Sequence, residues 1–181
     1  AAALGHDQFH LVGHDWGGAV AWALATEGAD RLLSATSVTT PHPQAMAAAM
    51  LRSNQLFKSR YMLAFQLPRL PEALIASERG GSFVRKAFID AGLPPESARH
   101  SMDLLRGGAS TGALNWYRAL PLSPPAKMRK VEVPVLYVYA TGDVALGRKA
   151  ADLTRNYVSG PYTYEVLDGV SHWVPEEEPE R

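Results

Sequence analysis

The sequence contains no cysteine, which excludes disulfides, thiol nucleophiles and thiolate metal ligands. The same absence fits a reducing cytoplasm, which is the location we expect. Neither charge is in excess, since 18 Lys and Arg residues balance 18 Asp and Glu residues. A nucleic-acid partner would favour a basic excess, so we expect no such partner.

Long apolar runs are absent as well. The run Val135–Ala140 suits one buried strand, and every apolar run is far too short to cross a membrane, so we expect no membrane span. The chain starts with alanine rather than methionine, and its first segment resembles a helix end that leads into a buried strand. We therefore expect a fragment, with any targeting signal lying upstream of it.

Four segments of Val-, Leu-, Thr- and Tyr-rich sequence are predicted strands, near residues 9–13, 32–39, 133–140 and 162–167. A segment with helical spacing joins the first two, which gives a β–α–β unit and therefore parallel strands. Residues 44–119 contain helix-like stretches broken by Pro and Gly and no convincing strand. We predict an α/β fold with a parallel-sheet core from residues 1–43 and 120–181, and a helical cap over 44–119.

A glycine-rich motif, Gly13-His14-Asp15-Trp16-Gly17-Gly18, lies at the predicted junction between the first strand and the following helix. It has the form of a nucleophile elbow, a strained turn whose crowding requires small neighbouring residues. The nucleophile position, where serine is usual, holds Asp15. The alternative interpretation is an ordinary strand-to-helix turn with an aspartate cap.

A carboxylate nucleophile restricts the reaction that the site can perform. Attack on a saturated carbon leaves an ester, which water can hydrolyse, whereas a serine would leave a stable ether. Ester hydrolysis needs a base, and His172 follows the last predicted strand. Asp143 follows the strand before it and is the predicted orienting acid, which gives the order nucleophile, acid, histidine. Asp168, four residues before His172, is the rival acid.

Three of the six histidines lie close together in the sequence, and their spacing invites a metal site. They are His6, His10 and His14. We do not favour this interpretation, and we expect neither a metal nor a cofactor.

Over essentially its whole length the sequence resembles the epoxide hydrolases of the α/β-hydrolase superfamily. The elbow resembles their nucleophile motif, and Ser171-His172-Trp173 resembles their catalytic-histidine loop. Asn115-Trp116-Tyr117-Arg118 and Tyr61-Met62-Leu63-Ala64-Phe65-Gln66 resemble the two cap segments that each carry a ring-opening tyrosine.

The resemblance implies the α/β-hydrolase fold and hydrolysis of an epoxide to a vicinal diol through a covalent ester on Asp15. Tyr61 and Tyr117 would donate hydrogen bonds to the epoxide oxygen as negative charge develops on it. The backbone N–H of Trp16 would be one oxyanion donor. The expected partner is a small apolar epoxide, because the predicted cap carries many apolar residues: Met62, Leu63, Phe65, Leu67 and Leu70.

Two other functions remain open at this point. Haloalkane dehalogenases share the elbow, and Trp16 would then serve as a halide donor. A non-catalytic α/β-hydrolase-like binding protein is the third possibility, although all three members of the expected triad are present. The sequence gives no indication of the oligomeric state.

The sequence departs from the family pattern before the elbow. The family has further N-terminal strands there, including a His-Gly loop that contributes to the oxyanion hole, whereas only fourteen residues precede Asp15. The second oxyanion donor therefore has no candidate, and the activity of the chain by itself is an open question.

Overall fold

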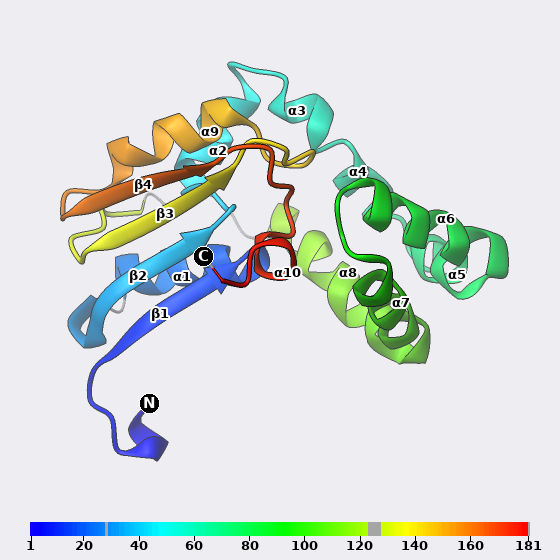
Figure 1. The fold of residues 1–181 in the computed structure, drawn as a ribbon, viewed down its shortest axis with the longest axis horizontal. Coiled ribbons are helices and arrows are strands. Elements are labelled where there is room, and N and C mark those ends of the chain that lie inside the picture. The colour runs from blue at the N-terminus through cyan, green and yellow to red at the C-terminus, as the bar shows by residue number, and fades with distance from the viewer. Residues whose placement is uncertain (28, 123–127, 181) are drawn as a thin grey trace. The chain divides into compact units, whose positions relative to one another are not determined.

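The structure is a computed structural model that describes residues 1–27, 29–122 and 128–180. The chain divides into two compact units (Figure 1). The sheet unit consists of the described parts of 1–58 and 126–170, and the helical unit consists of the described parts of 59–125 and 171–181.

The sheet unit contains four strands in the order β1-β2-β3-β4, and every neighbouring pair is parallel. They are β1 (Phe9–His14), β2 (Leu32–Val38), β3 (Val135–Ala140) and β4 (Tyr162–Leu167). The predicted α/β fold class is confirmed. Because the strands are parallel, the residues that follow them lie along one edge of the sheet, which is where chemistry is found in open α/β sheets.

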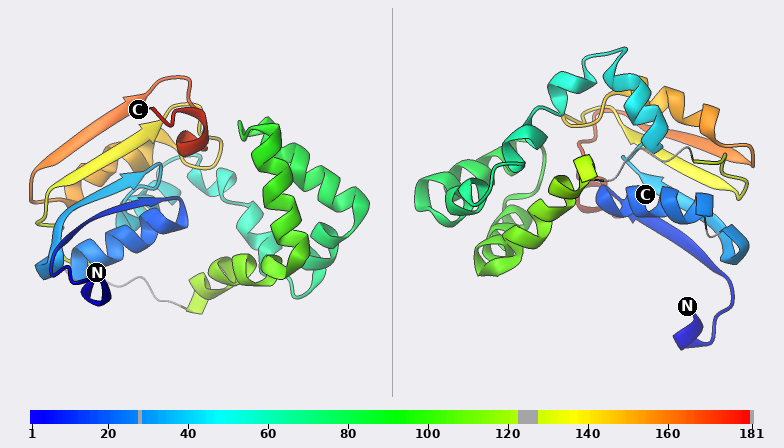
Figure 2. Two further views of the ribbon diagram at one scale, coloured as in Figure 1. Left: turned by 60° about the horizontal axis from the view of Figure 1, so that its bottom comes forward. Right: turned by 180° about the vertical axis from the view of Figure 1, so that it is seen from behind.

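Helices α1 (Trp16–Glu27), α2 (Pro43–Met50) and α9 (Arg148–Thr154) lie on one face of this sheet (Figures 1 and 2). Their small residues allow close packing, and Trp22 of α1 is fully buried against Tyr137 of β3. The unit also contains α3 (Gln55–Lys58) and three short 3₁₀ turns, at Ala2–Leu4, Ala29–Arg31 and Arg155–Tyr157.

The helical unit contains helices and no strand among its described residues. Its helices are α4 (Tyr61–Phe65), α5 (Leu70–Ala76), α6 (Glu78–Asp90), α7 (Pro95–Leu104), α8 (Ser110–Ala119) and α10 (Val174–Glu177). A π-helical turn at Leu105–Ala109 separates α7 from α8, and a 3₁₀ turn at Leu120–Leu122 follows α8. Ile75, Met102 and Leu114 form the core of this unit.

The boundaries of the two units differ from the predicted core and cap ranges. Residues 44–58 belong with the sheet, because α2 packs along α9 and the Gln55 amide donates to the Ala145 carbonyl. Residues 171–180 belong with the helices, where the Trp173 ring lies 5.7 Å from the Phe88 ring. These are contacts between segments far apart in the sequence, which local texture does not reveal.

In the described part of the chain, no helix combines the length and apolar character that a membrane crossing needs.

A buried histidine joins β2 to the helical layer of the sheet unit. His42 is fully buried, with its ring stacked 4.8 Å from Tyr157 and edge-on to Trp22 at 5.2 Å. Its Nδ1 accepts a hydrogen bond from the Gln44 backbone N–H and so caps α2. Burial penalises the charged imidazolium and lowers the pKa of His42 from 6.5 to about 4.

This burial predicts a pH-dependent stability. The folded pKa lies below the unfolded value, so the unfolded chain binds the extra proton. Stability should therefore be complete above about pH 6.5 and fall as the pH is lowered toward about 4. The shift corresponds to about 3 kcal/mol. In urea unfolding across this range, His42→Asn, which keeps an acceptor for the cap but does not titrate, should show a flatter dependence. An equally steep dependence in the variant would contradict this assignment.

Candidate active site

Asp15 occupies a left-handed turn between β1 and α1. Its φ is 52°, although it is not glycine, and α1 begins at the next residue. A non-glycine residue in this region is strained by about 1–3 kcal/mol and persists only where its surroundings fix it. The Asp15 side chain therefore stands at the N-terminal end of a helix, where the helix dipole favours a negative charge.

Two of the three elbow glycines are required by close packing. A Cβ on Gly13 would lie 2.1 Å from the Gly17 carbonyl oxygen, and one on Gly18 would lie 2.8 Å from both the Ser37 Oγ and the Thr40 Cβ. At Gly17 the expectation of crowding is wrong, since a Cβ there would meet no described atom within 4 Å. The strand crosses the first turn of α1 at Gly13, so only that crossing and the contact with β2 need glycine.

Thr40, which belongs to no motif recognised in the sequence, supports the turn. The Thr40 hydroxyl donates to the Asp15 carbonyl oxygen at 2.7 Å. The Thr40 carbonyl in turn accepts from the Ser37 hydroxyl at 2.7 Å and from the Trp22 indole N–H at 2.9 Å. The sequence signal that could have indicated Thr40 is its place, as a polar residue, shortly after a parallel strand. Thr40 ties the backbone of the proposed nucleophile to the end of β2.

Asp143 follows β3 at the same edge of the sheet and is 3% exposed. Its Oδ1 accepts hydrogen bonds from the backbone N–H groups of Ala145 and Leu146, at 2.7 and 2.8 Å. These two donors fix the orientation of the carboxylate. The rival acid Asp168 lies exposed on the turn after β4, where it accepts a hydrogen bond from the Thr141 hydroxyl. Burial and fixed geometry favour Asp143.

Tyr61 and Tyr117 are brought together in the helical unit. Their ring centroids are 6.0 Å apart, and Phe65 completes a three-ring cluster at 5.4 Å from Tyr61 and 4.9 Å from Tyr117. Tyr61 and Phe65 are one helical turn apart on α4, and Tyr117 belongs to α8. Two helices far apart in sequence therefore present both phenols side by side.

His172 lies in the segment that leads into α10, also in the helical unit, and is 8% exposed. Its ring meets the Trp173 ring edge-on at 5.4 Å. Glu177 accepts a hydrogen bond from the backbone N–H of Ser171, the residue before the histidine. Contacts made by Ser171 and by Trp173, the residues before and after His172, therefore hold the segment within the helical unit.

The described geometry brings together Asp15 and Asp143 along one sheet edge, and Tyr61 and Tyr117 in one aromatic cluster. In the described part of the chain, no three His, Asp or Glu residues are grouped as they would be around a metal ion.

The crowding at Gly13 predicts an asymmetry within the motif. Gly13→Ala should lower the free energy of unfolding by about 3 kcal/mol or more, because the atom in its way is backbone and cannot rotate aside. Gly17→Ala, four residues later in the first turn of α1, is the matched control and should change stability by about 1 kcal/mol or less, with a gain from helix propensity. Urea unfolding of both variants tests this prediction. Equal losses in the free energy of unfolding would contradict the steric role of Gly13 at the crossing.

The chain matches the alpha/beta hydrolase fold family over residues 1–179. It is 34% identical to epoxide hydrolase 3 of Xenopus tropicalis, over 98% of this chain and 51% of that protein. It is 35% identical to the AB hydrolase superfamily protein YfhM of Bacillus subtilis, over 93% of this chain and 61% of that protein. The chain therefore spans about half to three fifths of the length of these curated relatives.

Solved structures give the same result for the fold. One of the epoxide hydrolases found in metagenomes from hot environments superposes with a TM-score of 0.81 at 25% identity, over 99% of this chain and 66% of that one. The inhibitor complex of a Bacillus megaterium epoxide hydrolase gives 0.82 at 22% identity, over 99% and 68%, and supports the fold alone. With its parallel sheet and its match over nearly the whole length, this chain belongs to the alpha/beta hydrolase fold family.

Proposed function

We propose that the protein hydrolyses an epoxide to a vicinal diol through a covalent ester on Asp15. The observation that carries the proposal is the pairing of Tyr61 with Tyr117, whose rings lie 6.0 Å apart in one cluster. Two adjacent phenols suit a leaving group that is an oxygen anion, whereas a halide needs no such pair. The relatives named epoxide hydrolases support the same activity.

In the first step, a carboxylate oxygen of Asp15 attacks a ring carbon. The ring C–O bond breaks, and its electron pair moves to the epoxide oxygen. Tyr61 and Tyr117 donate hydrogen bonds to this oxygen and supply the proton that completes the hydroxyl. The product of this step is a hydroxyalkyl ester of Asp15.

In the second step, His172 takes a proton from water, and the water oxygen attacks the carbonyl carbon of the ester. The charge on the tetrahedral intermediate is stabilised by the Trp16 backbone N–H at the start of α1. The acyl C–O bond then breaks, and the departing alkoxide takes the proton held by His172, which releases the diol. The proton left on the Asp15 carboxyl group returns to the tyrosine phenolate and restores the starting state. Asp143 orients His172, and its own orientation is set by the backbone N–H groups of Ala145 and Leu146.

The two-step path predicts where an oxygen label appears. In a single turnover in heavy-oxygen water, the label should enter the Asp15 carboxylate, and the first diol should be largely unlabelled, because water attacks the ester carbonyl. His172→Gln should leave the first step and block the second, so that the ester accumulates and is detected by intact-protein mass. Asp168→Asn is the matched control and should not accumulate ester.

Labelled diol with unlabelled Asp15 would mean that water attacks the epoxide directly, and would make Asp15 a general base. Release of halide from a haloalkane without diol formation would favour the dehalogenase alternative. A protein that binds these compounds and releases neither product would fit the binding-protein alternative.

Loss of the phenol hydroxyls should slow the first step selectively. Tyr61→Phe or Tyr117→Phe should each reduce the rate of ester formation, and the double variant should reduce it by about 10²-fold or more, the usual effect of removing oxyanion donors. Hydrolysis of ester already formed should change little. Tyr164→Phe, which removes a phenol from β4, is the control and should retain the rate. Undiminished epoxide turnover in the double variant would remove the tyrosines from the mechanism.

A further inference from the structure

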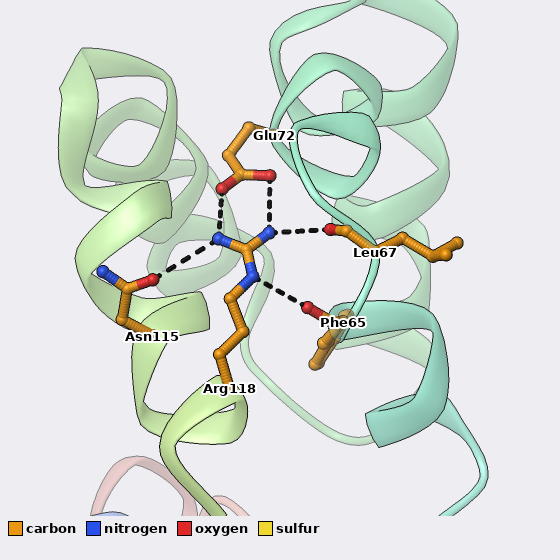
Figure 3. A network of polar contacts seen from close by, with 5 residues as sticks. All are labelled: Phe65, Leu67, Glu72, Asn115 and Arg118. Atoms are coloured by element: carbon orange, nitrogen blue, oxygen red, sulfur yellow. Dashed lines mark hydrogen bonds and ion pairs between the residues drawn. The ribbon is translucent and has the colours of Figure 1, made fainter. Parts of the chain in front are cut away.

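Arg118, the residue after Tyr117, is the centre of a network of polar contacts in the helical unit (Figure 3). The guanidinium Nε donates to the Phe65 carbonyl at 3.1 Å, and Nη2 donates to the Leu67 carbonyl at 2.9 Å. Nη1 and Nη2 also donate to the two carboxylate oxygens of Glu72, at 2.5 and 2.9 Å. One side chain of α8 thus contacts the end of α4, the turn that follows and the start of α5.

This ion pair is shielded from solvent far more than the others in the described part of the chain. The Arg118 and Glu72 side chains are 22% and 20% exposed, whereas the members of the other three pairs are 50–81% exposed. Hydrogen bonding from Arg118 lowers the pKa of Glu72, which keeps the carboxylate charged. Exposed pairs contribute little because water and salt screen them, so Arg118–Glu72 is the pair with the geometry to hold its surroundings.

Helix α4 needs this support because it is only five residues long. A single helical turn is unstable by itself, and the carbonyl groups at its end have no partner within the helix. Arg118 supplies a donor to the Phe65 carbonyl at that end. The Gln66 amide adds a second link by donating to the Tyr117 backbone carbonyl at 2.8 Å.

The backbone after α4 is strained as well. Arg69 has a φ of 61°, in the left-handed region that disfavours residues with a side chain. The segment returns to helix at Leu70, so the strained turn lies between α4 and α5. The contacts of Arg118 with the Leu67 carbonyl and with Glu72 hold the chain on both sides of this turn.

We propose that Arg118 is a positioning residue for the tyrosine pair, with Glu72 fixing its guanidinium. By holding the end of α4 against α8, Arg118 sets the distance and angle between Tyr61 and Tyr117, and so places both phenols at the epoxide oxygen. This inference rests on the proposed function for its effect on catalysis. A lysine could not fully replace Arg118, because a single ammonium group lacks the planar guanidinium that reaches two carbonyls and a carboxylate together.

The test compares Arg118→Met with Arg99→Met, which removes an arginine of the same unit whose pair with Glu96 is exposed. Arg118→Met should slow ester formation by about 10- to 100-fold, since a misplacement of about 1 Å can cost 10² in rate. The ester hydrolysis rate should change little, and Arg99→Met should behave as the parent. Arg118→Lys should recover only part of the loss.

A double-mutant comparison separates positioning from general destabilisation. In a Tyr61→Phe/Tyr117→Phe background, Arg118→Met should add less than about a twofold loss, because the groups that it positions have already gone. An equal fold loss in both backgrounds, or an equal loss in ester hydrolysis, would overturn the inference while leaving the proposed function intact. If Arg118→Met does not fold, Glu72→Gln, which keeps the shape of the partner, is measured in the same way.

A structural measurement decides the inference even if no epoxide is turned over. With labelled tyrosine, a nuclear Overhauser effect between the Tyr61 and Tyr117 rings should be present in the parent and in Arg99→Met, and lost or weakened in Arg118→Met or Glu72→Gln. An unchanged effect in the folded variants would overturn the positioning role. A parent that forms neither ester nor diol would overturn the proposed function instead.

Discussion

The close crossing of β1 over the first turn of α1 is the constraint on which the position of Asp15 depends. Gly13 allows this crossing, because a Cβ at that position would lie only 2.1 Å from the Gly17 carbonyl oxygen. That crossing forces the chain through a left-handed turn at Asp15, with φ of 52°. The strain is held by Thr40, which bonds the Asp15 carbonyl and is itself bonded by Ser37 and Trp22. The proposed nucleophile is therefore rigid because strand, helix and neighbouring strand all fix one residue.

The helical unit reaches the same end by another route. Its short α4 has no long hydrophobic seam, and a charged fork on α8 holds its end in place. At the elbow, small residues allow close contact between strand and helix. In the helical unit, the long side chain of Arg118 connects α8 to the end of α4. In both places, a residue with a proposed catalytic role lies against a neighbour in space for which no catalytic role is proposed. Rate in such a protein should depend on these neighbours as well as on the groups that touch the substrate.

Much of the fold could be predicted because its signals are local. Apolar runs gave all four strands to within two residues, and the Gly-rich motif after the first gave the turn and helix at Asp15. The unit boundaries could not be predicted in the same way. The packing of α2 on α9 and of Trp173 on Phe88 joins segments with nothing in their own sequence to mark the partner. Gly17 shows the opposite error, since a glycine in a motif need not be a glycine under steric demand.

The sequence by itself determined the parallel α/β class, the aspartate at the elbow and the residue types of the candidate site, because these follow from periodicity and from the chemistry of single side chains. Only the tertiary structure decided that the Thr40 hydroxyl bonds the Asp15 carbonyl, that Asp143 is buried while Asp168 is exposed, and that Arg118 of α8 contacts the end of α4. Such contacts depend on distance in space. The distance between two such residues is fixed only when side chains from separate elements pack together. No local sequence pattern specifies that distance.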